Sequence, residues 1–448
     1  MVGRRHGLSN TGGNIPKKYQ DLESGGNKKS TKDRFRDVAS QKLSDDRRND
    51  LKKRILKGID QGWFQEFRKS SEELKAIKNK KVRKFYEDQN QMLNDWIEVD
   101  SLVMAVTAGV LDSMDPDADH DGVIEHSGAL RDAGENVEQL LPEDEREARR
   151  KANKKARWAI NINVIANVIL LTAKVIAAFK SNSLSLIASL VDSALDLLCT
   201  LIVWTTNRLV GWRLNSLQEK FPVGRRRLEP LGILVFSIIM VISFLQILHE
   251  SVTKLLPSGD HTAADLPPVA IGAMLATIIL KGIIWFGCIP IKTTQVQALA
   301  QDCKTDVYFN TLSLLFPFIG QKAGVWWLDP AGAAILSLFI IFDWSSTCFD
   351  NVIRLSGSNV DYHVWKKLFF LAYRFSPVVD GFKVIRAYHA GDGVWTEMDL
   401  LLDEKTPLNK AHDIAETLQY CLEGLEEVDR AFVTTDYAQE GPTGHVNS

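Results

Sequence analysis

Cysteine is scarce in this chain, and the signatures of secreted proteins and of enzymes are missing. The 448 residues include only five cysteines, with no CxxC pair, so we expect neither a disulfide framework nor a zinc-finger site. The first residues, MVGRRHGLSNTGG, contain no apolar stretch typical of a cleavable signal peptide. No nucleophile motif, phosphate-binding loop or cofactor fingerprint is present, which argues against an enzyme and a resident cofactor. The formal net charge of −2 is almost neutral and does not by itself indicate a partner; we expect no nucleic-acid partner.

The distribution of charged and apolar residues along the chain is uneven. The mean hydropathy of −0.09 averages over long apolar runs in the middle and polar ends. The first 50 residues are rich in Gly, Ser, Asn, Lys and Asp, a composition that buries too little apolar surface to fold alone. We predict five parts: a largely disordered cytosolic N-terminus (1–80), a cytosolic helical region with acidic and basic stretches (81–157), a transmembrane domain (158–345), a cytosolic domain (346–437) and a tail (438–448).

Six segments are apolar and long enough to cross a bilayer, which takes about 20 residues. Lys and Arg are concentrated before the first segment, between the second and third, and after the sixth, and they are sparse in the other loops. The positive-inside rule then places both termini in the cytosol, in agreement with an even number of spans. The predicted fold is a membrane all-α six-span bundle with a cytosolic α+β ferredoxin-like C-terminal domain. The six predicted spans are 158–179, 184–205, 231–256, 268–289, 302–320 and 327–345.

Four aspartates lie inside these apolar segments, in two pairs of identical spacing. Asp192 and Asp196 lie in the second span, and Asp302 and Asp306 in the fifth. A carboxylate in the bilayer interior costs at least about 2.5 kcal/mol on insertion scales, so each needs a reason to be there. The four-residue spacing places both members of each pair on one face of a helix. Two such helices facing each other would gather four carboxylates, which predicts a transport site for a metal cation.

The types of ligand narrow the choice of ion. All four side chains are carboxylates, hard oxygen donors that suit Mn²⁺, Mg²⁺ or Ca²⁺, whereas histidine, which suits Zn²⁺, is absent from these positions. We therefore expect Mn²⁺, or Fe²⁺ nearby in the series. Protons compete with metal for clustered, desolvated carboxylates, which predicts metal/proton antiport. Asn310, one turn beyond Asp306, is a candidate ligand or supporting residue, or equally a polar residue at a helix interface. The alternative to a metal site is that a single aspartate has a structural role and pairs with Lys174 or Lys281 on another span.

One segment before the membrane domain carries part of a calcium-binding pattern. Residues 117–128 begin with Asp117, Asp119 and Asp121 at the spacing of an EF-hand loop, but the twelfth position is Gly128 rather than the bidentate glutamate. We interpret the segment as a solvated acidic loop.

The segment after the sixth span changes to the pattern of a small α+β domain. Apolar periodicity predicts a helix, two strands joined by a turn at 390–393, a second helix and a third strand. The order αββαβ suggests a ferredoxin-like layer of two helices on a three-stranded sheet. His389 and His412 in this domain are further metal candidates, although an isolated histidine is more often a surface or packing residue.

Four motifs along the chain belong together: Asp192-Ser-Ala-Leu-Asp196 and Asp302-Cys-Lys-Thr-Asp306 (DxxxD on spans two and five), the stretch FPVGRRRLEPLG before span three, and Phe85-Tyr86-Glu-Asp-Gln89 (aromatic-Tyr-x-x-Gln). Together they resemble the motifs of the cation diffusion facilitator family, and of its manganese-type branch, over about residues 80–437. Zinc-type members usually carry histidine in the paired motifs and often a histidine-rich loop between spans four and five, and the loop 290–301 has no histidine. In span five, Cys303 and Lys304 depart from the larger aromatic residue or histidine that is usual there.

The resemblance implies a homodimer of six-span subunits that dimerise through the C-terminal domain. We therefore expect an Mn²⁺ exporter that moves the ion from the cytosol into an organelle lumen or out of the cell. An internal membrane, vacuolar or Golgi-like, is preferred over the plasma membrane. The alternatives are a Zn²⁺, Fe²⁺ or Cd²⁺ transporter of the same fold and, from another class, a metal-gated channel or a membrane-anchored metal sensor. A channel needs a continuous polar lining, and the only polar stripe on the spans is formed by Asn161, Asn163 and Asn167.

Overall fold

The computed structural model divides the chain into two compact units, Met1–Lys53 and Arg54–Ser448. Residues 45–56 are helical, and the acidic segment 117–128 lies outside the described part of the chain. Side chains at some helical positions, among them 184–192, are likewise not described. The described residues are 45–57, 64, 66–114, 139–141, 143–181, 184–211, 227–256, 268–291, 293–323 and 327–440.

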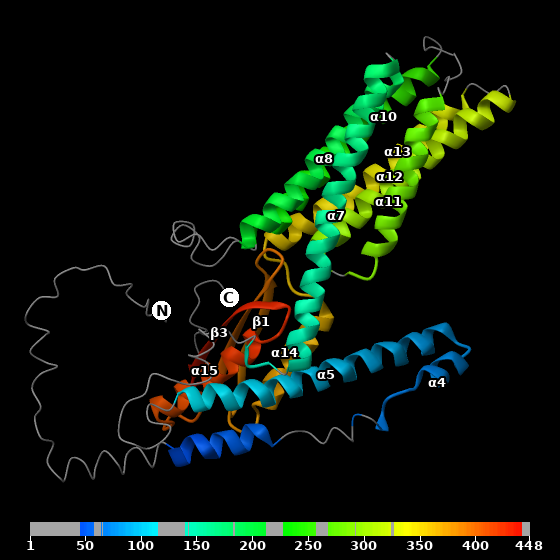
Figure 1. Ribbon diagram of the computed structural model, residues 1–448. Helices are drawn as coiled ribbons and strands as arrows, with labels where there is room; N and C mark the ends of the chain where they lie inside the picture. Colours follow the sequence, from blue (N-terminus) through cyan, green and yellow to red (C-terminus); the bar gives the residue numbers. More distant parts are fainter. Residues whose placement is uncertain are drawn as a thin grey trace, which may run out of the picture. The chain divides into compact units, whose positions relative to one another are not determined.

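Long helices occupy the positions of all six predicted spans (Figure 1). Four contain stretches that are long and apolar enough to cross a membrane: Glu145–Ile176, Leu228–Leu255, Ile271–Cys288 and Pro330–Leu355. The second and fifth predicted spans are helical as well, and the described part of the second contains the shorter apolar stretch Asp196–Thr206. The six helices are α7 (Glu143–Ser181), α8 (Leu184–Gly211), α10 (Leu228–Leu255), α11 (Pro268–Cys288), α12 (Thr294–Ala323) and α13 (Leu328–Leu355).

The helix bundle has an apolar interior and an apolar exterior. In the bundle α7 packs along α8, α10 along α13, and α11 along α12. Its interior includes Val203, Phe236, Leu299 and Trp344, each at most 1% exposed, and the Phe236 and Trp344 ring centroids lie 4.8 Å apart. Large side chains on the outside are also apolar, such as Phe342, which is 78% exposed. An apolar surface around a helical bundle is favourable in lipid and unfavourable in water.

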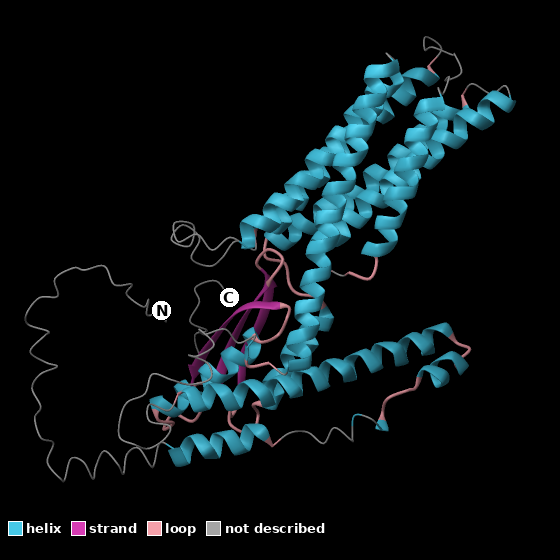
Figure 2. Cartoon of the chain, viewed as in Figure 1, coloured by secondary structure: helices cyan, strands magenta, loops and turns pink. Residues whose placement is uncertain are grey.

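The C-terminal part contains the predicted order of two helices and three strands. Strand β1 pairs antiparallel with β2, and β2 pairs parallel with β3, in the sheet order β1-β2-β3 (Figure 2). The turn between β1 and β2 contains Gly391 at φ +96°, a conformation that glycine adopts without strain. The elements are α14 (Tyr362–Arg374), β1 (Gly381–His389), β2 (Val394–Leu401), α15 (Leu408–Glu423) and β3 (Val428–Asp436).

A long helix from the N-terminal half, α5 (Lys80–Ser113), packs against α14 and α15. Its buried face includes Val99 and Val103, both fully buried. Asp100 on this face pairs with Arg374 of α14 at 2.7 Å, and both side chains are only 3% exposed. The helix therefore contributes to the core of the C-terminal domain, although about 260 residues separate it from α14. The shorter α4 (Ser71–Ala76), which begins with a capping box, precedes it.

The stability of this domain is predicted to depend on pH through the side chain of Glu427. Burial alone would raise the pKa of Glu427, but the Lys367 ammonium, 2.8 Å away, outweighs burial and the pKa lies below its usual 4.5. A lowered carboxyl pKa stabilises the folded state above the unfolded-state pKa, and this stability is lost as pH falls through the folded-state value. We expect the unfolding temperature, followed by tryptophan fluorescence, to fall less between pH 7 and pH 4 in Glu427→Gln than in wild type. The exposed neighbour Glu426 supplies the control, and an equal fall in Glu426→Gln and Glu427→Gln would contradict the assignment.

Candidate metal centre

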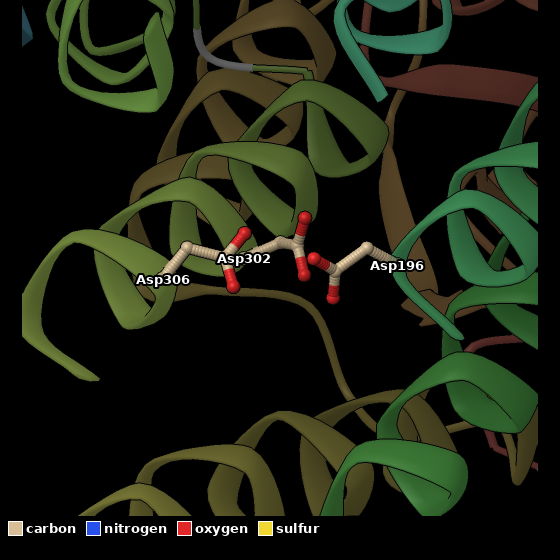
Figure 3. A group of neighbouring side chains, drawn as sticks. All are labelled: Asp196, Asp302 and Asp306. Atoms are coloured by element: carbon tan, nitrogen blue, oxygen red, sulfur yellow. The ribbon is translucent and has the colours of Figure 1, made fainter. Parts of the chain in front are cut away.

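Three of the four predicted aspartates come together inside the helix bundle. Asp196 of α8 and Asp302 and Asp306 of α12 each offer a carboxylate oxygen, and these oxygens lie within 4.8 Å of one another. Figure 3 shows the three carboxylates pointing toward a common point. The Asp302 side chain is fully buried, whereas those of Asp196 and Asp306 are 17% and 13% exposed. The spacing of one helical turn explains why Asp302 and Asp306 share a face of α12.

The fourth predicted aspartate, Asp192, lies one turn before Asp196 on α8. Its side chain is outside the described part of the structure, so its membership of the cluster stays a prediction. Asn310 donates a hydrogen bond from Nδ2 to the backbone carbonyl of Asp306, at 2.8 Å. This contact ties Asn310 to the helical turn that carries a cluster carboxylate, and its role as a ligand or supporting residue also stays a prediction.

A lysine lies at the centre of the cluster. Lys281 of α11 is fully buried, and its Nζ lies 2.5 Å from Asp306 Oδ2, 3.2 Å from Asp302 Oδ2 and 4.0 Å from Asp196 Oδ2. One ammonium cannot balance three ionised carboxylates, so the cluster still attracts a further cation. The sequence suggested lysine pairing as an alternative to a cation site, and the structure places Lys281 among the three clustered carboxylates. Lys174 lies on α7 and donates to Ser193 Oγ at 2.6 Å.

Polar contacts around the cluster hold α8 in position. Thr200 Oγ1 donates to the backbone carbonyl of Asp196 at 2.8 Å, and Asn167 Nδ2 of α7 donates to Thr200 Oγ1 at 2.6 Å. The Cys303 thiol donates a hydrogen bond to Asn163 Oδ1 at 3.8 Å. Lys304 pairs with Asp343 of α13 at 2.8 Å, so its charge is balanced by a partner outside the aspartate cluster.

Comparison with known proteins finds matches over most of the chain. The family model of the cation efflux transmembrane domain matches residues 160–356, which include the three clustered aspartates. Metal tolerance protein 5 of Oryza sativa subsp. japonica is 37% identical over 301 residues, which cover 66% of this chain and 71% of that protein. The chain belongs to the cation diffusion facilitator family.

Two further relatives extend the similarity. Metal tolerance protein 11 of Arabidopsis thaliana is 35% identical over 312 residues, covering 69% of this chain and 78% of the relative. Metal tolerance protein 7 of Oryza sativa subsp. japonica is 32% identical over 362 residues, covering 80% and 83%. Cation diffusion facilitators are membrane transporters, which confirms that this protein is not an enzyme and that metal is its transported substrate rather than its cofactor.

The two candidate histidines in the C-terminal part of this cation diffusion facilitator lie apart from the aspartate cluster. His389 ends β1 and is half-buried, and burial, assisted by the Arg354 charge, lowers its pKa. His412 is an exposed residue of α15, 3.1 Å from Glu416. Among the described residues, the aspartate cluster is the one group of three or more metal-ligating side chains that converge. Metal binding by either histidine stays a prediction.

The sequence indicated Lys281 only as an alternative partner of a single aspartate, and it did not connect Asn167 and Thr200 with this site. A lone lysine in the otherwise apolar α11 and the asparagines of α7 were visible signals. Their connection to the aspartates depends on how α7, α8, α11 and α12 pack, which periodicity within one helix does not reveal.

Proposed function

We propose that this cation diffusion facilitator exports a divalent cation, preferentially Mn²⁺, from the cytosol by metal/proton antiport. The observation that carries the proposal is the convergence of Asp196, Asp302 and Asp306 from two helices inside the bundle. The cluster offers hard carboxylate oxygens and no imidazole, a donor set that favours Mn²⁺ over Zn²⁺. The metal tolerance relatives support a metal as the transported cation. A Zn²⁺, Fe²⁺ or Cd²⁺ transporter with the same fold is the closest alternative.

We assign α8 and α12 to the membrane together with the four apolar helices. Both pack along candidate spans, α8 on α7 and α12 on α11, and both carry carboxylates of the cluster. The Lys/Arg distribution then places both termini and the C-terminal domain in the cytosol. The αββαβ order supports a ferredoxin-like domain. An internal membrane, vacuolar or Golgi-like, is the preferred location.

An aromatic face on α14 supports dimerisation through the C-terminal domain. Tyr362, Phe369 and Tyr373 are 52% to 71% exposed, and Trp365 stacks against Phe369 with ring centroids 5.1 Å apart. The groove beside these rings continues onto β1, the edge strand of the sheet. Exposed aromatic surface of this kind is typical of protein interfaces, and a second copy of this chain is the proposed occupant.

The burial pattern along α12 favours alternating access over a channel. Residues before the site, such as Val296 and Leu299, are fully buried in the apolar core, whereas no described residue of α12 after Asp306 is buried. Thr294, at the start of α12, donates a hydrogen bond to Asp392 of the C-terminal domain at 2.5 Å, which supports assigning the buried half to the cytosolic side. In the proposed topology apolar side chains close the cytosolic side of the site, and the Asp196 and Asp306 side chains are 17% and 13% exposed.

Uptake into proteoliposomes with an acidic interior tests the transport mechanism. We expect Mn²⁺ to accumulate, because internal protons displace the metal from the carboxylates, and we expect a protonophore to abolish accumulation. With one proton exchanged per metal, each unit of pH difference supports about a tenfold metal gradient.

The other results of this experiment separate the alternatives. Uptake that is indifferent to the pH gradient would contradict antiport. Equal uptake of Zn²⁺ and Mn²⁺ would contradict the ion assignment. Metal binding without accumulation would favour the channel or the sensor, in which the cytosolic domain carries the function.

A further inference from the structure

The Lys281 ammonium occupies the position that the transported cation needs. Its Nζ lies within 4.0 Å of an oxygen from each of the three clustered aspartates, and one carboxylate oxygen of each aspartate lies within 4.8 Å of those of the other two. A space of that size between three oxygens holds one cation at contact distance, since metal–oxygen bonds are about 2.0–2.6 Å long. The ammonium and a divalent ion therefore cannot occupy the centre of the cluster together.

The lysine comes from a helix that contributes none of the clustered aspartates. Lys281 lies on α11, whereas the carboxylates lie on α8 and α12. A lysine side chain has four flexible carbons, so its ammonium can move by several ångström while the helix stays in place. Asp302 Oδ1 is buried without a hydrogen-bond partner among the described residues, which leaves an acceptor at the same carboxylate. This unused acceptor is available to an arriving metal or to the displaced ammonium.

We propose that Lys281 is a tethered counter-cation that fills the carboxylate cluster when no metal is bound and is displaced when the metal arrives. The proposal rests on the transport function proposed above. In the metal-free protein, the ammonium reduces the repulsion between three buried carboxylates that would otherwise oppose repacking of the helices around an empty site. The ammonium also competes with the metal, which lowers affinity and promotes release on the far side.

Two variants of Lys281 and one matched control test this role. Lys281→Met removes the charge and keeps a long apolar side chain, and Lys281→Arg keeps the charge. Lys304→Met is the control, because Lys304 belongs to α12 but pairs with Asp343 outside the cluster. Equilibrium Mn²⁺ binding to the purified protein in detergent measures affinity. In proteoliposomes, net Mn²⁺ uptake is compared with exchange of radioactive Mn²⁺ against unlabelled Mn²⁺ inside.

Removal of a competing charge should tighten metal binding. It should also block the metal-free return, the step in which the empty transporter reorients to face the cytosol again. We expect Lys281→Met to bind Mn²⁺ about 10- to 100-fold more tightly than wild type, from the size of a charge–charge interaction at these distances. Net uptake should fall by a similar factor, while Mn²⁺/Mn²⁺ exchange, which needs no metal-free return, persists. Lys281→Arg should not bind Mn²⁺ more tightly than wild type, since its guanidinium keeps the competing charge. Lys304→Met should resemble wild type in both assays.

The contrary results are distinct from a failure of the transport proposal. If wild type neither binds nor transports Mn²⁺, the proposed function is wrong. Two results with an active wild type would contradict the counter-cation role: weaker Mn²⁺ binding by Lys281→Met, or loss of net uptake and exchange together. Lys281 would then only stabilise the packing of α11 against the helices that carry the aspartates. Should Lys281→Met fail to give a monodisperse protein, Lys281→Arg decides, because tighter binding in that variant would contradict competition by the charge.

Discussion

Asp302→Asn and Asp306→Asn are each expected to reduce Mn²⁺ uptake by at least about a hundredfold. Asparagine keeps the size of the side chain but removes one of the three negative charges that converge with Asp196. An interaction between charges about 4 Å apart in a protein interior is worth about 4 kcal/mol at an effective dielectric constant of 20, which corresponds to two to three powers of ten in affinity. The measurement is initial uptake into proteoliposomes with an acidic interior, normalised to the amount of inserted protein.

Asp343→Asn is the matched control, because Asp343 is also an aspartate of the helix bundle. It pairs with Lys304 at 2.8 Å and is 33% exposed, so its substitution should change uptake by no more than about fivefold. Equal losses in Asp343→Asn and Asp302→Asn would mean that any charge lost from the bundle disables the protein, and the cluster would lose its special role. Asp192→Asn in the same series tests the fourth predicted ligand.

The paired aspartates were predictable because their signal is local. Charge inside an apolar run and a four-residue spacing are both properties of a single helix, and they identified Asp196, Asp302 and Asp306 before any packing was known. Lys281 was noticed only as an alternative partner for a single aspartate. Its position among three carboxylates depends on how α11 packs against α12 and α8. The apolar periodicity of one segment does not show which other segments it packs against.

Hydropathy located the fifth span but not its beginning. The predicted segment begins at 302, whereas α12 begins at Thr294. The extra turns, TQVQALAQ, are too polar to be included in an apolar window, yet they form a helix because Val296 and Leu299 pack into the bundle core. Tertiary burial therefore extends this helix beyond the limit that composition suggested.

The role of α5 was missed for the same reason. Its sequence predicts helix but does not name a partner, and the partner α14 is about 260 residues away. The contact includes the Asp100–Arg374 ion pair and a stack of Trp96 on Phe370, with ring centroids 5.0 Å apart. A segment that precedes the membrane helices in sequence thus completes the domain that follows them.

Arg374→Met is expected to destabilise this C-terminal domain by about 3–5 kcal/mol. The substitution leaves the Asp100 carboxylate buried without its positive partner, and an uncompensated buried charge costs about that much. Arg374 also donates to the backbone carbonyl of Ile55 at 3.2 Å, so the segment before α5 loses a contact as well. Urea unfolding of the detergent-solubilised chain, followed by tryptophan fluorescence, measures the change, since Trp96 reports directly on the α5–α14 contact.

Two further variants separate charge from packing at this contact. Lys383→Met breaks the Lys383–Asp436 pair, in which Asp436 is 30% exposed, and should cost much less stability than Arg374→Met. The double variant Asp100→Leu with Arg374→Met replaces the buried pair with apolar side chains and should recover most of the lost stability. If Arg374→Met costs no more than Lys383→Met, α5 is not an integral part of the domain. If the double variant is as unstable as Arg374→Met, the loss comes from packing and the backbone contact rather than from an unpaired charge. Recovery in the double variant would identify α5 as a structural element of the C-terminal domain. Burial of apolar side chains would then hold α5 in place, and the ion pair would be a secondary contact.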